Sequence, residues 1–220
     1  MNRHLLTALS LCCAAASAHA TPVVLGSTTQ GSLSIGNATA VSFSGYDGSA
    51  SVNTGTLSQG YTGTLNALTA GTISFTYLGH ESTYANVFNF NGQHLSQGLF
   101  TGGTLSANIA AGAVNFSFTN HAGLFGWDTT TYANGSSVGS MAFMPAVSTA
   151  KYGNFDFVIG FNDKRPGSSV GDRDFDDFVV GVKFTPKFTP PAIPEPGTWA
   201  LMALGLAAVA GAAAVSRRRA

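Results

Sequence analysis

The sequence predicts an all-β fold, an antiparallel β-sandwich of jelly-roll-like form, with an N-terminal signal peptide and a single C-terminal hydrophobic helix. Two observations predict the sandwich. Helical periodicity is scarce in the central region, where short β-branched and aromatic runs are separated by Gly, Asn and Ser. Within several runs apolar and hydroxyl side chains alternate, which gives each strand one apolar and one polar face, as two packed antiparallel sheets require.

Six segments carry the strand pattern. In residues 72–78, Ile73, Phe75 and Tyr77 lie on one face, with threonine and serine on the other. The stretch 45–71, rich in Gly, Ser and Thr, is expected to form a long loop or short edge strands. The segments expected to be strands are residues 41–43, 72–78, 85–90, 113–119, 155–161 and 178–184.

The composition excludes several classes of protein. The 220 residues are 45% hydrophobic and only 9% charged, with ten basic and ten acidic residues, which excludes a disordered polyelectrolyte. The interior of the sequence has no Lys/Arg patch, so we expect no nucleic-acid partner. The only cysteines, Cys12 and Cys13, lie in the predicted signal peptide, and the mature chain would therefore have neither thiol catalysis nor Cys-ligated zinc.

Residues 1–20 have the organisation of a secretory signal peptide. Arg3 precedes an apolar run, and the run ends in the small-residue signal Ala18-His19-Ala20, so cleavage is expected before Thr21. The exported β-sandwich domain is then predicted at residues 21–187, which is long enough for one domain with a sizeable core.

The C-terminal segment has three predicted parts: a Pro-rich linker at residues 188–197, a transmembrane helix at 198–216 and a cytoplasmic arginine tail at 217–220. The prolines of the linker are expected to keep it extended. The 20 uncharged residues from Gly197 to Ser216 would span roughly 30 Å as a helix, the thickness of a bilayer core. The residues of this predicted signal are Pro194, Glu195, Pro196, Gly197, Arg217, Arg218 and Arg219.

A Pro-Glu-Pro tripeptide, an apolar span and a terminal arginine cluster, in this order, resemble the PEP-CTERM sorting signal of exported proteins in Gram-negative bacteria. The resemblance covers residues 193–219. It implies that an exosortase-type processing enzyme acts near the tripeptide while the C-terminal helix holds the chain in the inner membrane. The processed protein is then expected at the cell surface or outside the cell.

One cluster of acidic residues is a candidate metal site. Asp172, Asp174 and Asp176 alternate along the chain beside Asp177, and Asp163 would approach them if the flanking strands pair as a hairpin. Carboxylates at alternate positions of a tight loop are typical of Ca²⁺ sites, although the Gly and Glu of an EF-hand are missing here. Calcium is the one cofactor that the sequence suggests.

A different interpretation of this segment needs no ion. The acidic hairpin would be solvated and neutralised by Lys164, Arg165 and Arg173, and Asp177 would cap turn amides. The segment also resembles, together with residues 72–90, a pattern of exported PEP-CTERM proteins and related bacterial surface β-domains. In that pattern a phenylalanine-rich strand ends in Asn-Asp, and an acidic loop leads into the final strand. This second resemblance implies no known catalytic activity.

Three functions are compatible with these patterns. The first is a non-enzymatic envelope or extracellular-matrix protein associated with exopolysaccharide, because the exported region is rich in Ser, Thr and Asn and poor in charge. The second is a carbohydrate-binding module with a structural calcium, in which Trp127 and Tyr132 would contact sugars. The third is an enzyme, which would require His80, Glu81 and Asp128 to converge in one pocket. We expect the first, with no catalytic residues.

Overall fold

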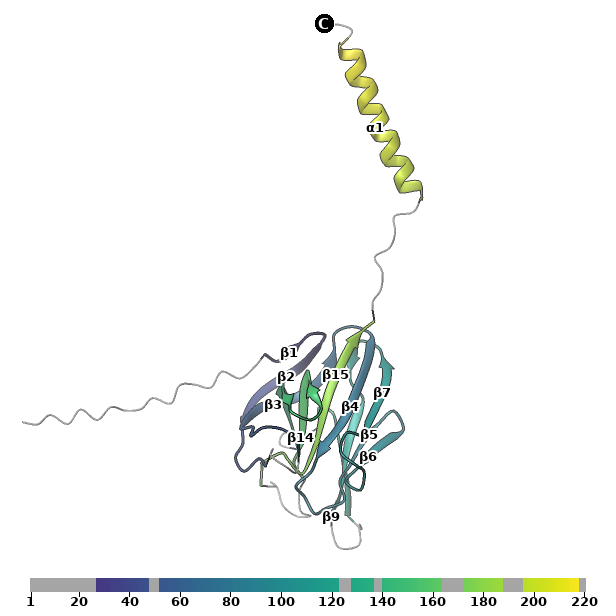
Figure 1. The fold of residues 1–220 in the computed structure, drawn as a ribbon. Coiled ribbons are helices and arrows are strands. Elements are labelled where there is room, and N and C mark those ends of the chain that lie inside the picture. The colour runs from purple at the N-terminus through teal and green to yellow at the C-terminus, as the bar shows by residue number, and fades with distance from the viewer. Residues whose placement is uncertain are drawn as a thin grey trace, which may run out of the picture.

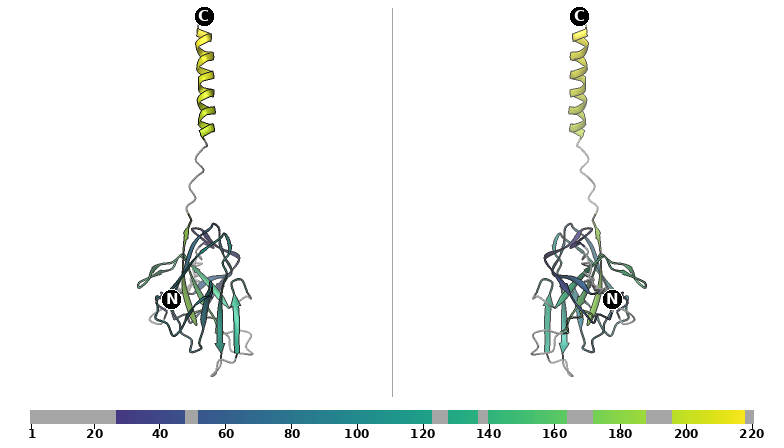
Figure 2. Two further views of the ribbon diagram at one scale, coloured as in Figure 1. Left: turned by 90° about the vertical axis from the view of Figure 1, so that its right-hand side faces the viewer. Right: turned by 90° about the vertical axis from the view of Figure 1, so that its left-hand side faces the viewer.

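The computed structural model describes residues 27–47, 52–122, 128–136, 140–163, 172–187 and 196–217. Within these ranges the chain is mostly antiparallel β-structure with one helix, α1 (Pro196–Arg217), as the sequence predicts. The strands form a larger and a smaller sheet that face each other as a sandwich, together with one short hairpin (Figures 1 and 2).

The larger sheet contains strands from nearly the whole length of the sandwich domain. Among the described residues its strands are β1 (Thr29–Gln30), β2 (Leu33–Ser42), β3 (Gln59–Ala67), β4 (Gly71–Gly79), β7 (Thr104–Ile109), β8 (Gly112–Ala113), β11 (Met141–Pro145), β14 (Phe157–Phe161) and β15 (Phe178–Pro186). They lie in the order β1-β2-β3-β11-β14-β15-β4-β7, and β8 pairs with β3 off this path. Each pairing is antiparallel.

The smaller sheet covers part of the larger one. Its described strands, in the order β10-β9-β5-β6, are β5 (Val87–Phe90), β6 (Gln93–Ser96), β9 (Phe116–Ala122) and β10 (Asp128–Ala133). The hairpin is made of β12 (Ser148–Thr149) and β13 (Gly153–Asn154).

Aromatic side chains fill the space between the two sheets. The ring of Phe75 on β4 has its centroid 4.8 Å from that of Phe88 and 4.7 Å from that of Phe90, both on β5. Phe118 on β9 stacks on Phe161 of β14 at 4.7 Å. All five rings are buried, and close aromatic pairs of this kind add to the free energy gained from burial.

The central strands of the larger sheet are buried on both faces. All five residues of β14 and the first five of β15 are buried, which explains their continuous apolar sequences. On the face away from the smaller sheet, loops contribute a second apolar cluster that includes Phe43, Phe155 and Phe175. These side chains hold the loops against the sheet.

Several strand predictions are confirmed. β4 buries Ile73, Phe75 and Tyr77 and leaves the intervening hydroxyl residues exposed or half-buried, and the segments 155–161 and 178–184 correspond to β14 and β15. The prediction of a loop or short edge strands in residues 45–71 is wrong for β3. That strand has nine residues and lies inside the sheet, between β2 and β11.

Glycines in β3 explain the error, because they permit a close approach between strands and do not mark turns. A Cβ atom on Gly60 would lie 3.0 Å from the carbonyl oxygen of Phe143 on β11. Gly63 has φ +151°, and a Cβ there would lie 2.6 Å from the carbonyl oxygen of Gly36 on β2. Glycine is the residue that fits such positions.

The C-terminal helix begins earlier than predicted. The prediction placed Pro196 and Gly197 in an extended linker, whereas both belong to α1. A proline is tolerated in the first turn of a helix, because its missing N–H has no intrahelical partner there. Large apolar side chains of α1 such as Trp199 and Leu201 are exposed, and Figure 1 shows the helix apart from the sheets.

The predicted transmembrane span at residues 198–216 is not supported. Within the described residues, no helix combines the length and the apolar character needed to cross a membrane. Alanine supplies eight of the 17 residues from 199 to 215, and its small side chain buries less apolar surface than leucine.

Candidate metal centre

Three segments of the chain meet at one end of the larger sheet. β4 and β14 both pair antiparallel with β15, so they end where β15 begins: Gly79 lies opposite Val179, and Phe161 opposite Phe178. This is the end of β15 that is remote from the C-terminal segment (Figure 1). We call the carboxylates gathered there the acidic site: Asp47, Glu81, Asp163, Asp172, Asp174, Asp176 and Asp177.

Asp163, two residues after the end of β14, connects two loops. Its backbone N–H donates to Asp177 Oδ2 at 2.7 Å, and the predicted hairpin pairing of the flanking strands is thereby confirmed. Its own Oδ2 accepts hydrogen bonds from Ser82 Oγ at 2.6 Å and from Asn86 Nδ2 at 2.7 Å. Ser82 and Asn86 follow β4 and were not predicted as site residues. Asp163 is not among the described carboxylates whose oxygens converge for an ion, and its hydrogen bonds connect the loop after β4 to the loop before β15.

The loop before β15 is anchored by an apolar side chain. Arg173 and Phe175 have left-handed φ angles of 68° and 63°, which are uncommon for residues other than glycine. The ring of Phe175 is 1% exposed, with its centroid 5.2 Å from that of Phe43. This anchor fixes the backbone on either side of it, where the acidic residues lie.

Three carboxylates of this loop converge. One oxygen from each of Asp172, Asp174 and Asp177 lies within 4.8 Å of the others. Two oxygens bound to one Ca²⁺ at 2.3–2.6 Å are at most about 5 Å apart, so a single ion can reach all three. Asp172 is exposed, Asp174 half-buried and Asp177 buried, an arrangement that leaves one side open to solvent.

Asp176 is the most deeply buried carboxylate of the site, with 0% exposure. Its Oδ2 accepts the backbone N–H of Asp47, and its backbone carbonyl accepts the N–H of Glu81 at 3.0 Å. Its Oδ1, like the Oδ1 of Asp174, is buried without a hydrogen-bond partner. Leaving a buried polar atom unsatisfied costs about 1–3 kcal/mol.

Burial and mutual repulsion raise the pKa values of these acids. Burial, followed by the charges of Asp176 and Asp172, raises the pKa of Asp174 to about 8. Burial, followed by the charge of Asp163, raises the pKa of Asp177 to about 8. Both shifts mean that the charged carboxylates oppose folding at neutral pH unless a positive charge offsets them.

Glu81 belongs to the same electrostatic group. Burial raises the pKa of its carboxyl, and so do the charges of Asp176, Asp172, Asp47 and Asp163. The sequence suggested Glu81 only as a catalytic candidate.

The structure describes one of the three basic residues that the sequence suggested as counterions. Arg173 is exposed on the loop, whereas Lys164 and Arg165 lie outside the described residues.

The enzyme hypothesis required His80, Glu81 and Asp128 to share a pocket. His80 interacts through Nδ1 with the hydroxyl of Tyr77, while Glu81 lies in the field of the acidic site. Asp128 begins β10, in the other sheet. The geometry thus assigns Glu81 to the acidic site.

The aromatic residues proposed to contact sugars have different positions. Tyr132 on β10 is half-buried and packs against the core, with its ring centroid 5.5 Å from that of Phe161. Trp127 lies outside the described residues.

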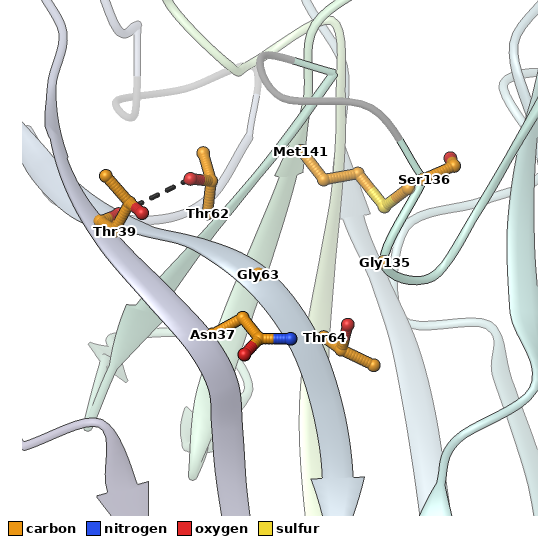
Figure 3. Close-up of a pocket in the computed structure, with 8 residues that line it drawn as sticks. All are labelled: Asn37, Thr39, Thr62, Gly63, Thr64, Gly135, Ser136 and Met141. Carbon is orange, nitrogen blue, oxygen red and sulfur yellow. Dashed lines mark hydrogen bonds between the residues drawn. The ribbon is translucent and has the colours of Figure 1, made fainter.

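A small polar pocket lies beside β2, β3 and the turn after β10 (Figure 3). Its volume is about 170 Å³, which is less than the 300–1,000 Å³ typical of ligand pockets. The hydroxyl of Thr62 donates to the carbonyl of Thr39 at 3.4 Å across it. Uncharged side chains and glycines line the pocket: Asn37, Thr39, Thr62, Gly63, Thr64, Gly135, Ser136 and Met141.

Comparison with known proteins identifies the C-terminal signal. A family model described as the PEP-CTERM protein-sorting motif matches residues 192–219, which confirms the resemblance found in the sequence. This signal implies export, processing by an exosortase and sorting to the cell surface. No curated protein and no solved structure matches the chain.

Proposed function

We propose that the chain is a non-enzymatic protein of the cell surface or extracellular matrix that associates with exopolysaccharide. The observation that carries the proposal is the sorting motif at residues 192–219. The proposed route begins with removal of the signal peptide at residues 1–20. It continues through an inner-membrane intermediate, which an exosortase-type enzyme processes near Pro194-Glu195-Pro196.

Rows of hydroxyl and amide groups on the sheet faces support association with a hydrated polysaccharide. Across β4 and β7, Thr72 Oγ1 donates to Asn108 Oδ1 at 2.7 Å, and the hydroxyls of Thr76 and Thr104 lie 3.0 Å apart. A similar pair of threonine hydroxyls links β9 to β10. Hydroxyl and amide groups both donate and accept hydrogen bonds, as sugar hydroxyls do. Phosphate backbones, by contrast, require clustered Lys and Arg.

A triple substitution tests the sorting step. Pro194→Ala, Glu195→Ala and Pro196→Ala together should leave the protein in the membrane fraction with an unprocessed C-terminus, whereas the wild type should reach the surface or medium in processed form. Intact-mass spectrometry of each fraction locates both cleavages. The control, Pro190→Ala with Pro191→Ala, changes two prolines just outside the matched residues and should behave as the wild type. Normal processing of the triple variant would refute the proposal.

A carbohydrate-binding module is the second candidate, favoured by the same rows of hydroxyl groups. It differs from the first in requiring an aromatic contact with sugar. Because Tyr132 packs against the core, Trp127 is the residue to test. Binding on a glycan array that is lost in Trp127→Ala would support a module, and a flat array would argue against it. Binding to the cell's own exopolysaccharide, measured by co-sedimentation, tests the matrix proposal directly.

A further inference from the structure

We propose that the acidic site binds one Ca²⁺ ion. We further propose that this ion joins segments remote in the sequence, residues 43–47, 80–86, 162–163 and 172–177, so that this end of the sandwich becomes fully ordered only where Ca²⁺ is millimolar. The inference goes beyond the sorting function. Binding of Ca²⁺ does not depend on that function, whereas filling of the site after export rests on it.

Buried oxygens without donors carry the argument. Asp176 is 0% exposed, and its Oδ1 has no hydrogen-bond partner. The Oδ1 of Asp174 is also buried and without a partner, and the two carboxyl groups lie within hydrogen-bonding reach of each other. Ionised carboxylates only accept hydrogen bonds, so a proton or a cation must lie between them.

The donor set selects calcium. The carboxylates of Asp172, Asp174 and Asp177 converge within 4.8 Å, and the buried carboxyl of Asp176 lies beside that of Asp174. Calcium takes six to eight oxygen ligands in flexible geometry, whereas Mg²⁺ demands a near-ideal octahedron at 2.0–2.1 Å and usually retains several waters. Zinc prefers nitrogen and sulfur ligands, and the nearby imidazole of His80 is engaged with Tyr77.

Hydrogen bonds already connect the segments that the ion would stabilise. Asp176 receives the N–H of Asp47 through its side chain and the N–H of Glu81 through its carbonyl. The side chain of Asp163 accepts hydrogen bonds from Ser82 and Asn86, which lie in the loop after β4. These hydrogen bonds bring several carboxylates together, so the bonds are stable only when the negative charge of the acidic site is neutralised. An ion held by the loop before β15 would do this for every segment at once.

The affinity expected of such a site links it to the extracellular space. Extracellular calcium modules have dissociation constants of about 10⁻⁴–10⁻³ M. A site in this range remains empty at the low free Ca²⁺ of a cytoplasm and fills after export. The charge repulsion within the empty site would disfavour complete folding before the chain leaves the cell.

Thermal unfolding of the full chain, followed by circular dichroism, tests binding. Adding millimolar Ca²⁺ after EGTA treatment should raise the Tm by roughly 1–6 °C, the range that dissociation constants of 10⁻³–10⁻⁴ M give for a domain of this size, because the ion binds the folded state. Millimolar Mg²⁺ should have a much smaller effect. No shift with Ca²⁺, or an equal shift with Mg²⁺, would overturn the proposal.

Two matched substitutions separate the site from general charge effects. Asp174→Asn removes a repelling charge, so in EGTA it should be at least as stable as the wild type, yet it should lose the Ca²⁺-dependent shift. Asp156→Asn changes an acid outside the acidic site, whose Oδ2 accepts the N–H of Phe184, and should keep the shift. A full Ca²⁺ response in Asp174→Asn would show that the ion binds elsewhere.

Hydrogen exchange tests whether the ion joins the segments. The amides of Asp47 and Glu81, which both bond to Asp176, should exchange at least several-fold more slowly in Ca²⁺ than in EGTA. Protection confined to residues 172–177 would show that the ion binds one loop without joining the others.

Discussion

Replacing Gly160 by alanine should loosen the acidic loop from the sheet. Gly160 lies in β14, directly beneath the loop that carries the acidic residues. A Cβ atom at this position would overlap the carbonyl oxygen of Phe175 and would lie 3.0 Å from the Cβ of Phe175. The overlap with the carbonyl oxygen sets the shift, so the loop would have to move away by more than about 1 Å to restore ordinary van der Waals contact.

This displacement has a predictable cost in stability. Phe175 is 1% exposed, and its ring lies 5.2 Å from that of Phe43, centroid to centroid, so moving it disturbs the second apolar cluster. Overpacking of a well-packed core costs about 1–3 kcal/mol. We expect Gly160→Ala to lower the free energy of unfolding by about 2 kcal/mol and the Tm by about 4–8 °C.

Chemical and thermal unfolding of the full chain, followed by circular dichroism, measure both quantities. The control is Gly55→Ala, because Gly55 is exposed, lacks a left-handed φ and has no atoms within 4 Å of the place that a methyl group would occupy. That variant should match the wild type or gain slightly. If Gly160→Ala were as stable as Gly55→Ala, the packing of Phe175 would not anchor the loop as we argue.

Three further predictions concern the core between the sheets, the side chain of Asn134 and the titration of the acidic site. Phe75→Ala should lower the free energy of unfolding by about 3–5 kcal/mol, since Phe75 is fully buried between the sheets; a loss below about 1 kcal/mol in urea unfolding would contradict this. Asn134→Ala should lower the free energy of unfolding by about 1–3 kcal/mol, because the side-chain amide of Asn134 accepts a hydrogen bond from the backbone N–H of Leu65 and donates one to its carbonyl. A Tm equal to that of the wild type would show that these two bonds do not stabilise the fold. In chelator, the free energy of unfolding should fall as the pH rises from about 5 to about 8. The raised pKa values of Asp174 and Asp177 make the folded state bind more protons than the unfolded state in this range. Urea midpoints that stay constant or rise with pH would contradict this prediction.

The sequence predicted well those strands whose two faces differ. β4 alternates apolar and hydroxyl residues, and its face assignment is correct. β3 was missed because its glycines weaken the strand pattern, although Gly60 and Gly63 are needed for close packing against neighbouring strands. β7 lies at one edge of the larger sheet, and none of its residues is buried. Its sequence therefore lacks the row of large apolar residues by which a strand is recognised.

The acidic site was predictable only where its residues are close in the sequence. The spacing of the loop before β15 indicated converging carboxylates, and hairpin pairing brought in Asp163. Glu81 and Asn86 join them because β4 pairs with β15 across about a hundred residues of sequence, and no local pattern shows that pairing. The neighbouring residues His80 and Glu81, in a region with few charges, suggested catalysis. In the structure Glu81 lies close to the carboxylates of the acidic site.

The last strand separates the acidic loops from the sorting tail. β15 has nine residues, which extend roughly 30 Å, and the acidic loops lie before its first residue whereas the chain leads to the tail from its last. A molecule attached to an envelope by its C-terminus would therefore present the acidic loops at its distal pole. Neighbouring polymers and dissolved cations could therefore reach the acidic loops while the C-terminus is still attached.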